Sequence, residues 1–222
     1  MKKKLEKLFF IYGSGGSGTE ILSMLNERNS SGKNIKLFNN NQLVVVDDLN
    51  NEKNKKVISI KKLLNIKNKI KEGTIGIQDP NIKKKIYEKI KKKVNFFNFK
   101  HSTSLIYNNV KIGIGHVLWP YVIIFQNVKI GNFFHASMYA NIGHDSKIGN
   151  YVSFGPGVRC GGNVEIGDNV FIGTNAIIYP GSKKKKLKIG KNSIIGAGAF
   201  IIDDVPPNST FAGNPARMIF KK

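Results

Sequence analysis

The chain has 222 residues, with 36 lysines and arginines against 14 aspartates and glutamates, and its formal net charge is +22. Hydrophobic residues make up 41% of it, enough to bury the core of one large domain or two small ones, and a single cysteine excludes a disulfide framework within the chain. So large a positive charge raises nucleic acid as a partner. Arginine, which base-reading sites favour, occurs only three times. We therefore expect the lysines to cover solvated surfaces and predict no nucleic-acid partner.

No apolar stretch approaches the roughly 20 residues needed to span a bilayer. The apolar run from Leu8 to Tyr12, behind the basic N-terminus, is too short for the hydrophobic region of a secretory signal. We therefore predict no membrane insertion and a cytoplasmic location.

Residues 8–99 alternate between strand-like and helix-like patterns, which predicts a parallel sheet with helices on its faces. Strands are expected at 8–12, 43–48, 74–77 and 94–99, and helices after Gly18, within 58–66 and over 81–92. We assign residues 1–99 to this first α/β domain. Its size is that of half a dinucleotide-binding Rossmann fold.

A glycine-rich loop, Gly13-Ser14-Gly15-Gly16-Ser17-Gly18, joins the first strand to the first helix and matches the pattern G-x-G-x-x-G. Such glycines let a pyrophosphate approach the backbone amides at a helix N-terminus. Asp47 and Asp48 end the second strand and are candidates to bind ribose hydroxyls, although they lie 29 and 30 residues past Gly18 instead of about 20. Half a dinucleotide site suits one nucleotide diphosphate. A glycine-rich turn without a ligand is the alternative.

A six-residue repeat occupies the chain from His101 to about Val205. Every sixth residue from Ile106 is apolar, Cys160 included, and the frame resumes at Ile189 after a shift of five residues at a lysine run. This period fits neither a helix nor a simple strand, and it is typical of short strands joined by corners, with three sides to a turn. We therefore predict a parallel β-helix over residues 100–222 with Cys160 in its core, and a C-terminal tail from about 206 to 222.

Two other positions of the repeat also suggest structural roles. Glycine follows the apolar residue in ten repeats, and we interpret it as supplying the backbone angles of the corners. Small or β-branched residues usually stand two places before the apolar residue and leave room inside a narrow prism. Large residues on the outward positions are expected to pack between subunits or to cover their own prism: Trp119, Phe125, Phe133 and Tyr139.

The chain has four histidines, at 101, 116, 135 and 144. A zinc site of the β-helix carbonic anhydrase type needs one histidine far upstream of a close pair. The spacings of 19 and 9 residues after His116 do not match this, so we predict no metal. His144 is the best candidate for chemistry, because it lies two residues past an inward isoleucine and should project outward. A neutral imidazole there can accept a proton near pH 7, and Asp145 beside it can raise its basicity. A surface His-Asp pair in a turn is the alternative.

The sequence resembles the hexapeptide-repeat acyltransferases. The likeness rests on the repeat, on the His144-Asp145 pair, on Gly-Pro-Gly-Val-Arg-Cys-Gly-Gly-Asn at 155–163 and on Ala-Gly-Asn-Pro-Ala-Arg at 212–217. Together with the half-Rossmann domain, these features resemble the NeuD/PglD-type sugar acetyltransferases over essentially the whole chain. The resemblance implies a left-handed parallel β-helix, a homotrimer with active sites at subunit interfaces, acetyl-CoA as co-substrate and no metal.

The resemblance also implies roles for individual residues. His144 matches the general base, Asp145 its acidic partner, and the N–H of Gly162 the donor to the thioester oxyanion. Substrate contacts are expected at Gly13, Ser14, Gly15, Gly16, Ser17, Asp47, Asp48 and Gln78, and cofactor contacts at Ser153, Gly162, Thr174, Gly196, Ala197, Pro215 and Arg217. Ser17 and Ser153 depart from the family pattern, in which histidine stands in some members.

The reaction that the resemblance implies is direct transfer of acetyl from acetyl-CoA to the C4 amine of a nucleotide-linked 4-amino-4,6-dideoxy sugar, for the synthesis of a surface glycan such as O-antigen. Two alternatives stay open: O-acetylation of a sugar of the sialic acid type, and a non-catalytic nucleotide-binding module. The lysine run at 183–186 is a corner insertion. We expect it either to be a solvated loop or to contact the phosphates of coenzyme A.

Overall fold

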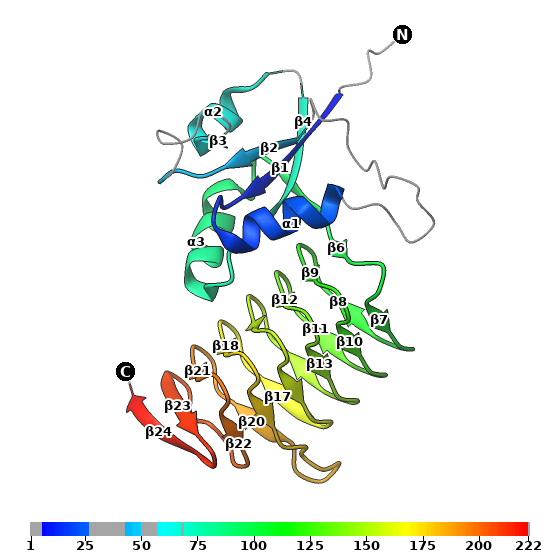
Figure 1. Ribbon diagram of the computed structural model, residues 1–222, viewed down its shortest axis with the longest axis vertical. Helices are drawn as coiled ribbons and strands as arrows, with labels where there is room; N and C mark the ends of the chain where they lie inside the picture. Colours follow the sequence, from blue (N-terminus) through cyan, green and yellow to red (C-terminus); the bar gives the residue numbers. More distant parts are fainter. Residues whose placement is uncertain (1–5, 27–42, 50–56, 68, 222) are drawn as a thin grey trace. The chain divides into compact units, whose positions relative to one another are not determined.

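The computed structural model describes residues 6–26, 43–49, 57–67 and 69–221 (Figure 1). The chain divides into two compact units, Met1–Gln78 with Ile82–Phe97, and Asp79–Asn81 with Asn98–Lys222. None of the helices in the described ranges is long and apolar enough to cross a membrane.

The first unit is built on a five-stranded parallel sheet in the order β3-β2-β1-β4-β5. Its elements are β1 (Glu6–Tyr12), α1 (Gly16–Asn26), β2 (Leu43–Val46), β3 (Val57–Ile58), α2 (Ile60–Asn65), β4 (Lys69–Ile75), α3 (Pro80–Ile90) and β5 (Asn95–Phe96). Phe10 and Ile11 point to opposite faces of β1 and both are fully buried, as expected for a central strand covered on two sides.

The strand order of this sheet reverses between β1 and β4. The chain adds β2 and β3 on one side of β1, then returns to add β4 and β5 on the other. Open α/β sheets bind ligands at such a switch point, outside the carboxyl ends of the strands. The loop that begins at Gly13 and the segment that follows Ile75 both lie at this edge, where the amide of Gly76 donates to the carbonyl of Tyr12 at 2.8 Å.

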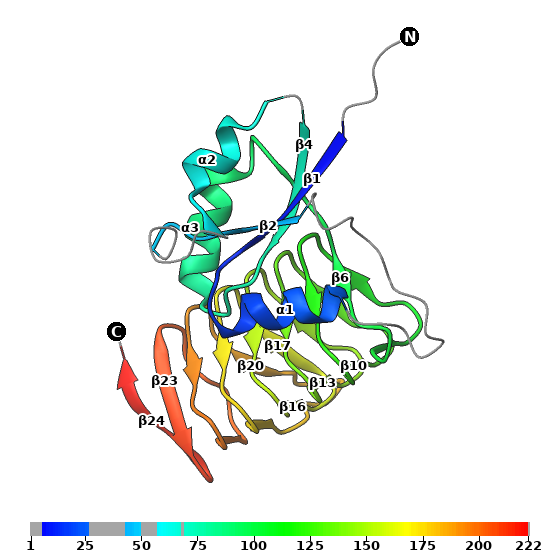
Figure 2. The same cartoon turned by 45° about the horizontal axis from the view of Figure 1, so that its top comes forward.

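The second unit is a parallel β-helix with three sheets as its sides (Figures 1 and 2). Its strands are β6 (Phe99–Lys100), β7 (Leu105–Ile106), β8 (Lys111–Ile112), β9 (Val117–Leu118), β10 (Ile123–Ile124), β11 (Lys129–Ile130), β12 (His135–Ala136), β13 (Asn141–Ile142), β14 (Lys147–Ile148), β15 (Ser153–Phe154), β16 (Arg159–Cys160), β17 (Val164–Ile166), β18 (Phe171–Ile172), β19 (Ile177–Ile178), β20 (Leu187–Ile189), β21 (Ile194–Ile195) and β22 (Phe200–Ile201). Consecutive strands occupy different sides, so each strand pairs with the strand one coil further on, as Ile142 of β13 pairs with Cys160 of β16.

The C-terminal tail extends one of these sheets instead of lying apart from the prism. It forms β23 (Ser209–Gly213), which pairs parallel with β21, and β24 (Ala216–Lys221), which returns antiparallel to β23. The segment expected as a last strand at 94–99 is divided. Its first part is β5 of the first unit, and Phe99 begins β6, which pairs with β9.

The six-residue frame is confirmed as the core of the β-helix. From Leu118 to Ile201, every residue of the frame is at most 6% exposed, and Cys160 is 2% exposed. The first frame residue is not buried as expected, because Ile106 in the first coil is 38% exposed. Large and small inward side chains also compensate for one another inside the prism. Where the frame has the small Ala136, the position two before it has Phe134, which packs edge-on against Phe154 with ring centroids 5.3 Å apart.

The interpretation of the repeated glycines as corner residues is wrong. The left-handed corner conformation belongs to residues such as Asn127, Tyr139 and Asp145, with φ near 60°, and not to the glycines that follow the frame residues. Those glycines are required by the stacking of coils. A Cβ on Gly113 would lie 2.8 Å from the backbone nitrogen of Asn132, and one on Gly143 would lie 2.3 Å from that of Gly162. Asparagine and aspartate tolerate the left-handed region better than other residues with side chains.

The large outward residues divide into two groups. Trp119 and Phe133 are buried, whereas Phe125 and Tyr139 are 36% and 61% exposed. Tyr139 stacks on Tyr121 one coil earlier, with ring centroids 5.1 Å apart and an interplanar angle of 4°.

Candidate active site

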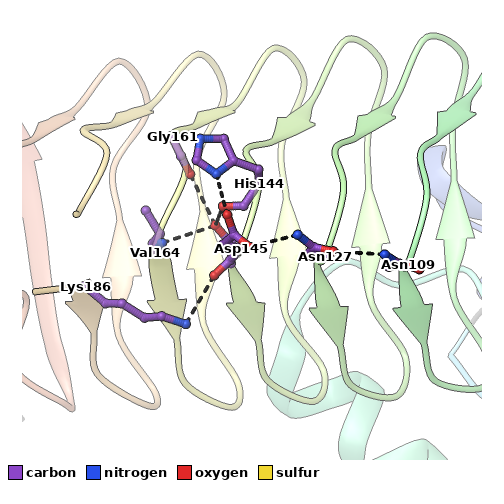
Figure 3. A network of polar contacts seen from close by, with 8 residues as sticks. Asn109, Asn127, His144, Asp145, Gly161, Val164 and Lys186 are labelled. Carbon is purple, nitrogen blue, oxygen red and sulfur yellow. Dashed lines mark hydrogen bonds and ion pairs between the residues drawn. The ribbon is translucent and has the colours of Figure 1, made fainter. Parts of the chain in front are cut away.

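His144 and Asp145 form a hydrogen-bonded pair at the corner that follows β13 (Figure 3). Nδ1 of His144 lies 2.7 Å from Oδ2 of Asp145, and the two side chains are 49% and 38% exposed. Since a carboxylate only accepts, Nδ1 carries the proton in this bond and Nε2 keeps its lone pair in the neutral ring. The pair therefore presents a basic nitrogen at the surface of the coil.

A ladder of amides holds Asp145 from the preceding coils (Figure 3). Nδ2 of Asn127 donates to Oδ1 of Asp145 at 3.0 Å, and Nδ2 of Asn109 donates to Oδ1 of Asn127 at 3.3 Å. The hydrogen bond from His144, and next the one from Asn127, hold the pKa of Asp145 below its usual value. Asp145 is thus an ionised carboxylate with both oxygens fixed, which in turn fixes the imidazole.

Gly162 lies against the free nitrogen of the imidazole, one coil further on. A Cβ placed on Gly162 would lie 2.7 Å from Nε2 of His144, so the ring rests where a side chain would otherwise stand. Gly162 is buried, and its N–H donates to no residue in the described part of the chain, whereas its carbonyl accepts from Gly181 at 3.0 Å. Buried amides are almost always paired. A base and an unused amide donor side by side are the two groups that acyl transfer requires.

Ser146 ties this corner to the next coil. It occupies the small inward position before Ile148 and is 2% exposed. Its Oγ accepts from the amide of Val164 at 3.1 Å and lies 3.3 Å from the carbonyl oxygen of Gly161. The hydroxyl therefore fixes the spacing between the His144 corner and the segment that contains Gly162.

The glycine-rich loop of the first unit is built as an anion-binding turn requires. Gly13 has φ +111°, and a Cβ on Gly18 would lie 1.9 Å from the carbonyl oxygen of Gly13, so both positions need glycine. By contrast, a Cβ on Gly15 or Gly16 would meet no atom within 4 Å, and α1 begins at Gly16. Open space in front of a helix N-terminus suits a phosphate group. Ser17 lies in the first turn of α1.

The two aspartates at the end of β2 support this loop. Oδ2 of Asp47 accepts from the backbone N–H and the hydroxyl of Ser14 at 2.9 and 2.7 Å, and Oδ1 accepts from the amide of Leu49 at 2.8 Å. Asp47 therefore holds the glycine-rich loop in shape. We had predicted it only as a ligand of ribose hydroxyls.

Asp48 is held in the same way. Oδ1 accepts from the amide of Ile60 at 2.8 Å, and Oδ2 accepts from Nζ of Lys89 at 2.9 Å and from Tyr12 at 3.3 Å. Burial opposes its ionisation, but the Ile60 amide and the Lys89 ammonium outweigh burial and lower the pKa of Asp48. Burial, together with the charge of Asp48, raises the pKa of Tyr12 to about 12. Gln78, the remaining predicted substrate contact, follows β4 at the same edge of the sheet.

No family model matches the chain. A curated relative, GDP-perosamine N-acetyltransferase of Escherichia coli O157:H7, is 36% identical over 214 residues, which cover 95% of each chain. The protein belongs to the NeuD/PglD-type sugar acetyltransferases. It is therefore an enzyme, an acyltransferase, as the sequence predicted.

Solved structures agree with the fold of this acetyltransferase. WeeI from Acinetobacter baumannii AYE is 33% identical, with a TM-score of 0.89 over 96% of this chain and 100% of that one. PerB from Caulobacter crescentus, solved in complex with CoA and GDP-perosamine, is 22% identical, with a TM-score of 0.80 over 96% and 97% of the two chains. The second likeness shows the fold alone.

The residues predicted to contact the cofactor lie on two different edges of the β-helix of the acetyltransferase. Gly162 follows β16, whereas Thr174 follows β18, and Gly196 and Ala197 follow β21, which belongs to another sheet. Ser153 lies on β15 of that other sheet and is buried. The described chain therefore does not gather these residues into one site.

Two cavities lie along the edge that holds Gly162. One of about 480 Å³ is lined by the lysine insertion together with Pro180 and Asp203, and one of about 180 Å³ shares Asp203 and reaches Arg217. Pro215 is exposed in the turn of the terminal hairpin. Of the predicted cofactor contacts, Arg217 lines the smaller of these two cavities.

The remaining candidate groups of the acetyltransferase take no part in this arrangement. His116 and His135 are buried, and burial raises the pKa of the Cys160 thiol to about 12, which rules it out as a nucleophile near neutral pH. Among the described residues, no group of three or more histidine, cysteine, aspartate or glutamate side chains is arranged to hold a metal ion.

Sequence reasoning missed three residues that build the site, namely Asn127, Ser146 and Lys186. Asn127 had a visible signal, because asparagine at 109, 127 and 163 and aspartate at 145 recur every 18 residues. Ser146 also had one, as a polar residue on a small apolar position. Nothing local to the lysine run indicates which of its members contacts the site.

Proposed function

We propose that the protein transfers the acetyl group of acetyl-CoA to the 4-amine of a GDP-linked 4-amino-4,6-dideoxy sugar of the perosamine type. The observation that carries this is Nε2 of His144 facing Gly162, whose N–H has no partner in the described chain. The choice of sugar and nucleotide is supported by the relative named GDP-perosamine N-acetyltransferase.

In this proposal His144 is the general base of a direct transfer. The sugar amine attacks the thioester carbonyl, a C–N bond forms, and Nε2 takes the proton that the amine loses. The oxyanion accepts a hydrogen bond from the N–H of Gly162. Collapse breaks the C–S bond, and the thiolate of coenzyme A takes the proton back from His144. The products are the acetamido sugar and the free thiol of coenzyme A.

Asp145 keeps the imidazole in the reactive tautomer throughout. Its ionised carboxylate accepts from Nδ1, so Nε2 faces the substrate as an acceptor and the imidazolium that forms is stabilised. The absence of an acyl-enzyme in the proposal is supported by the burial of Cys160.

We place the diphosphate of the substrate at the N-terminus of α1. Support comes from the open space over Gly15 and Gly16, where neither glycine would bring a Cβ near any atom. Asp47 and Asp48 then act chiefly by holding the loop in shape through Ser14 and Tyr12.

We further propose that the β-helix is left-handed and that three copies assemble into a homotrimer. The predicted cofactor residues lie on two edges of one prism, and a groove between neighbouring copies would bring one edge of each together. Exposed aromatic pairs supply an apolar surface for such packing: Tyr107 stacks on Phe125 at 5.3 Å and Tyr121 on Tyr139 at 5.1 Å. We assign the enzyme to the cytoplasm and its product to surface glycan synthesis.

A thiol-release assay with acetyl-CoA and a panel of acceptors tests the function. The panel holds GDP-perosamine, the UDP- and dTDP-linked 4-amino-4,6-dideoxy sugars, GDP-mannose as the matched hydroxyl sugar, and sialic acid. We expect release with the amino sugars and the highest kcat/KM with the GDP-linked one. Release with the hydroxyl acceptors alone would assign an O-acetyltransferase, and release with none of them would contradict the proposal.

A further inference from the structure

The four lysines of the corner insertion do not share one environment. Lys183, Lys184 and Lys185 are exposed, whereas Lys186 is half-buried and is followed by Leu187, which is 7% exposed. Neither a solvated loop nor a loop that binds a phosphate group would require one of these lysines to be half-buried. The position of Lys186 therefore needs its own explanation.

The insertion is a closed turn stacked on the Gly162 corner. The amide of Ser182 donates to the carbonyl of Lys185 at 2.8 Å, and the amide of Lys185 donates to Oγ of Ser182 at 3.0 Å. Gly181 and Leu187 at its two ends donate to the carbonyls of Gly162 and Asn163, at 3.0 and 3.2 Å. The loop is thus fixed in register with the coil that supplies the free amide.

From this fixed end, the side chain of Lys186 reaches back across the coils to Asp145 (Figure 3). Its Nζ donates to the backbone carbonyl oxygen of Asp145 at 3.2 Å, and 41 residues separate the two in the sequence. The contact joins the coil above Gly162 to the coil below it. Because its donor is charged, this hydrogen bond is stronger than a neutral one of the same geometry, and it restrains the corner that carries His144 and Asp145.

We propose that Lys186 is a positioning residue of the acetyltransferase, whose ammonium holds the Asp145 corner and thereby keeps Nε2 of His144 over Gly162. The proposal rests on the proposed function of that site. The other restraints on Asp145 come from the preceding coil, through the carbonyl of Gln126 and the amide of Asn127. Lys186 holds the corner from the opposite side. It adds to the Ser146 hydroxyl and to the amide of Asn163, which donates to the carbonyl of His144 at 2.8 Å.

Three variants test the proposal. Lys186→Met removes the ammonium and keeps most of the side chain, Lys186→Arg keeps a cation that can reach the carbonyl, and Lys184→Met removes one charge from the same loop at an exposed position. Since a base displaced by about 1 Å can cost about 10²-fold in rate, we expect Lys186→Met to lower kcat by about tenfold. The Michaelis constants for both substrates should stay within about twofold of wild type, because no substrate contact is lost. Lys186→Arg should recover most of kcat, and Lys184→Met should behave as wild type.

Three results would overturn the proposal. An unchanged kcat in Lys186→Met does so, and so does a loss confined to the Michaelis constant for acetyl-CoA, which would assign the loop to the phosphates of coenzyme A. An equal loss in Lys184→Met would indicate a general effect of charge. Wild-type protein that acetylates no acceptor would instead contradict the proposed function.

A spectroscopic readout tests the positioning role without turnover. In long-range ¹H–¹⁵N spectra, the ring nitrogens of His144 should report one tautomer in the wild type and in Lys186→Arg, and move toward averaged values in Lys186→Met. Identical ring signals in wild type and Lys186→Met would refute the role.

Discussion

Gly162→Ala perturbs the contact between Gly162 and His144 by adding a single methyl group. The new methyl group would lie 2.7 Å from Nε2 and 2.9 Å from Cε1 of His144, closer than carbon atoms approach such groups in folded proteins. Gly162 does not have a positive φ, so alanine is compatible with its backbone. The imidazole is half-exposed and can swing away, and we expect it to do so while the coil stays folded.

Displacing the base in this way should lower kcat by about 10²-fold, which corresponds to about 2.7 kcal/mol of transition-state stabilisation. The assay is continuous thiol release with acetyl-CoA and GDP-perosamine, with the melting temperature as the control for folding. Turnover at the wild-type rate would refute the geometry that we infer for the pair.

A double-mutant cycle identifies the route of this effect. If the methyl group acts by displacing His144, then Gly162→Ala should cost little further activity in a His144→Ala background. A full second loss of about 10²-fold in the double variant would show that the methyl group acts on the amide or on the substrate instead.

Three other predictions concern single groups. Burial raises the pKa of the Cys160 thiol to about 12, so the thiol should resist a thiol reagent in the folded protein and react fully after denaturation. Cys160→Ala should keep kcat within about twofold. Rapid labelling of the native protein would contradict the burial of Cys160. Asp145→Asn should lower kcat by at least about tenfold, because the amide no longer fixes the tautomer of His144, and wild-type kinetics would exclude that role. Burial lowers the pKa of His116, so the unfolded chain binds a proton more readily than the folded chain at this residue. The stability of the fold therefore falls as the pH drops below about 6.5. His116→Gln should reduce the loss of melting temperature between pH 7.5 and 5.5, and an equal loss in both proteins would refute this prediction.

The β-helix was predictable because its core repeats. One apolar residue in six, over residues 118–201, is a pattern that few folds produce, and all of it is buried. The reason for its glycines was not predictable, since sequence does not distinguish a strained backbone from a close approach of the next coil. The positive φ of Asn127 and the clash that a Cβ on Gly143 would make become visible only once the coils are stacked.

The limits in the first unit have a similar cause. The edge strand β3 is two residues long, too short to show a period. The single strand predicted at 94–99 covers β5 and the first residue of β6, which belong to different sheets. Short strands take their identity from their partners, which are distant in sequence.

The candidate site was half visible in the sequence. His144 and Asp145 were candidates from their place in the repeat, Gly162 came from the resemblance to a family, and the structure brings the three together. Ser146 and Lys186 act through contacts that span 15 to 41 residues. Ser146 leaves a local signal, as a polar residue on a small apolar position, whereas no local pattern reveals Lys186. Asp47 and Asp48 were recognised as important, but their bonds to the loop and to Lys89 require the packed sheet.

Turnover of purified His144→Ala with acetyl-CoA and GDP-perosamine tests the central claim most directly. We expect a rate at least about 10²-fold below wild type. The oligomeric state and melting temperature should stay unchanged, because the fold does not depend on an exposed imidazole. Acetylation by this variant at the wild-type rate would contradict His144 as the general base.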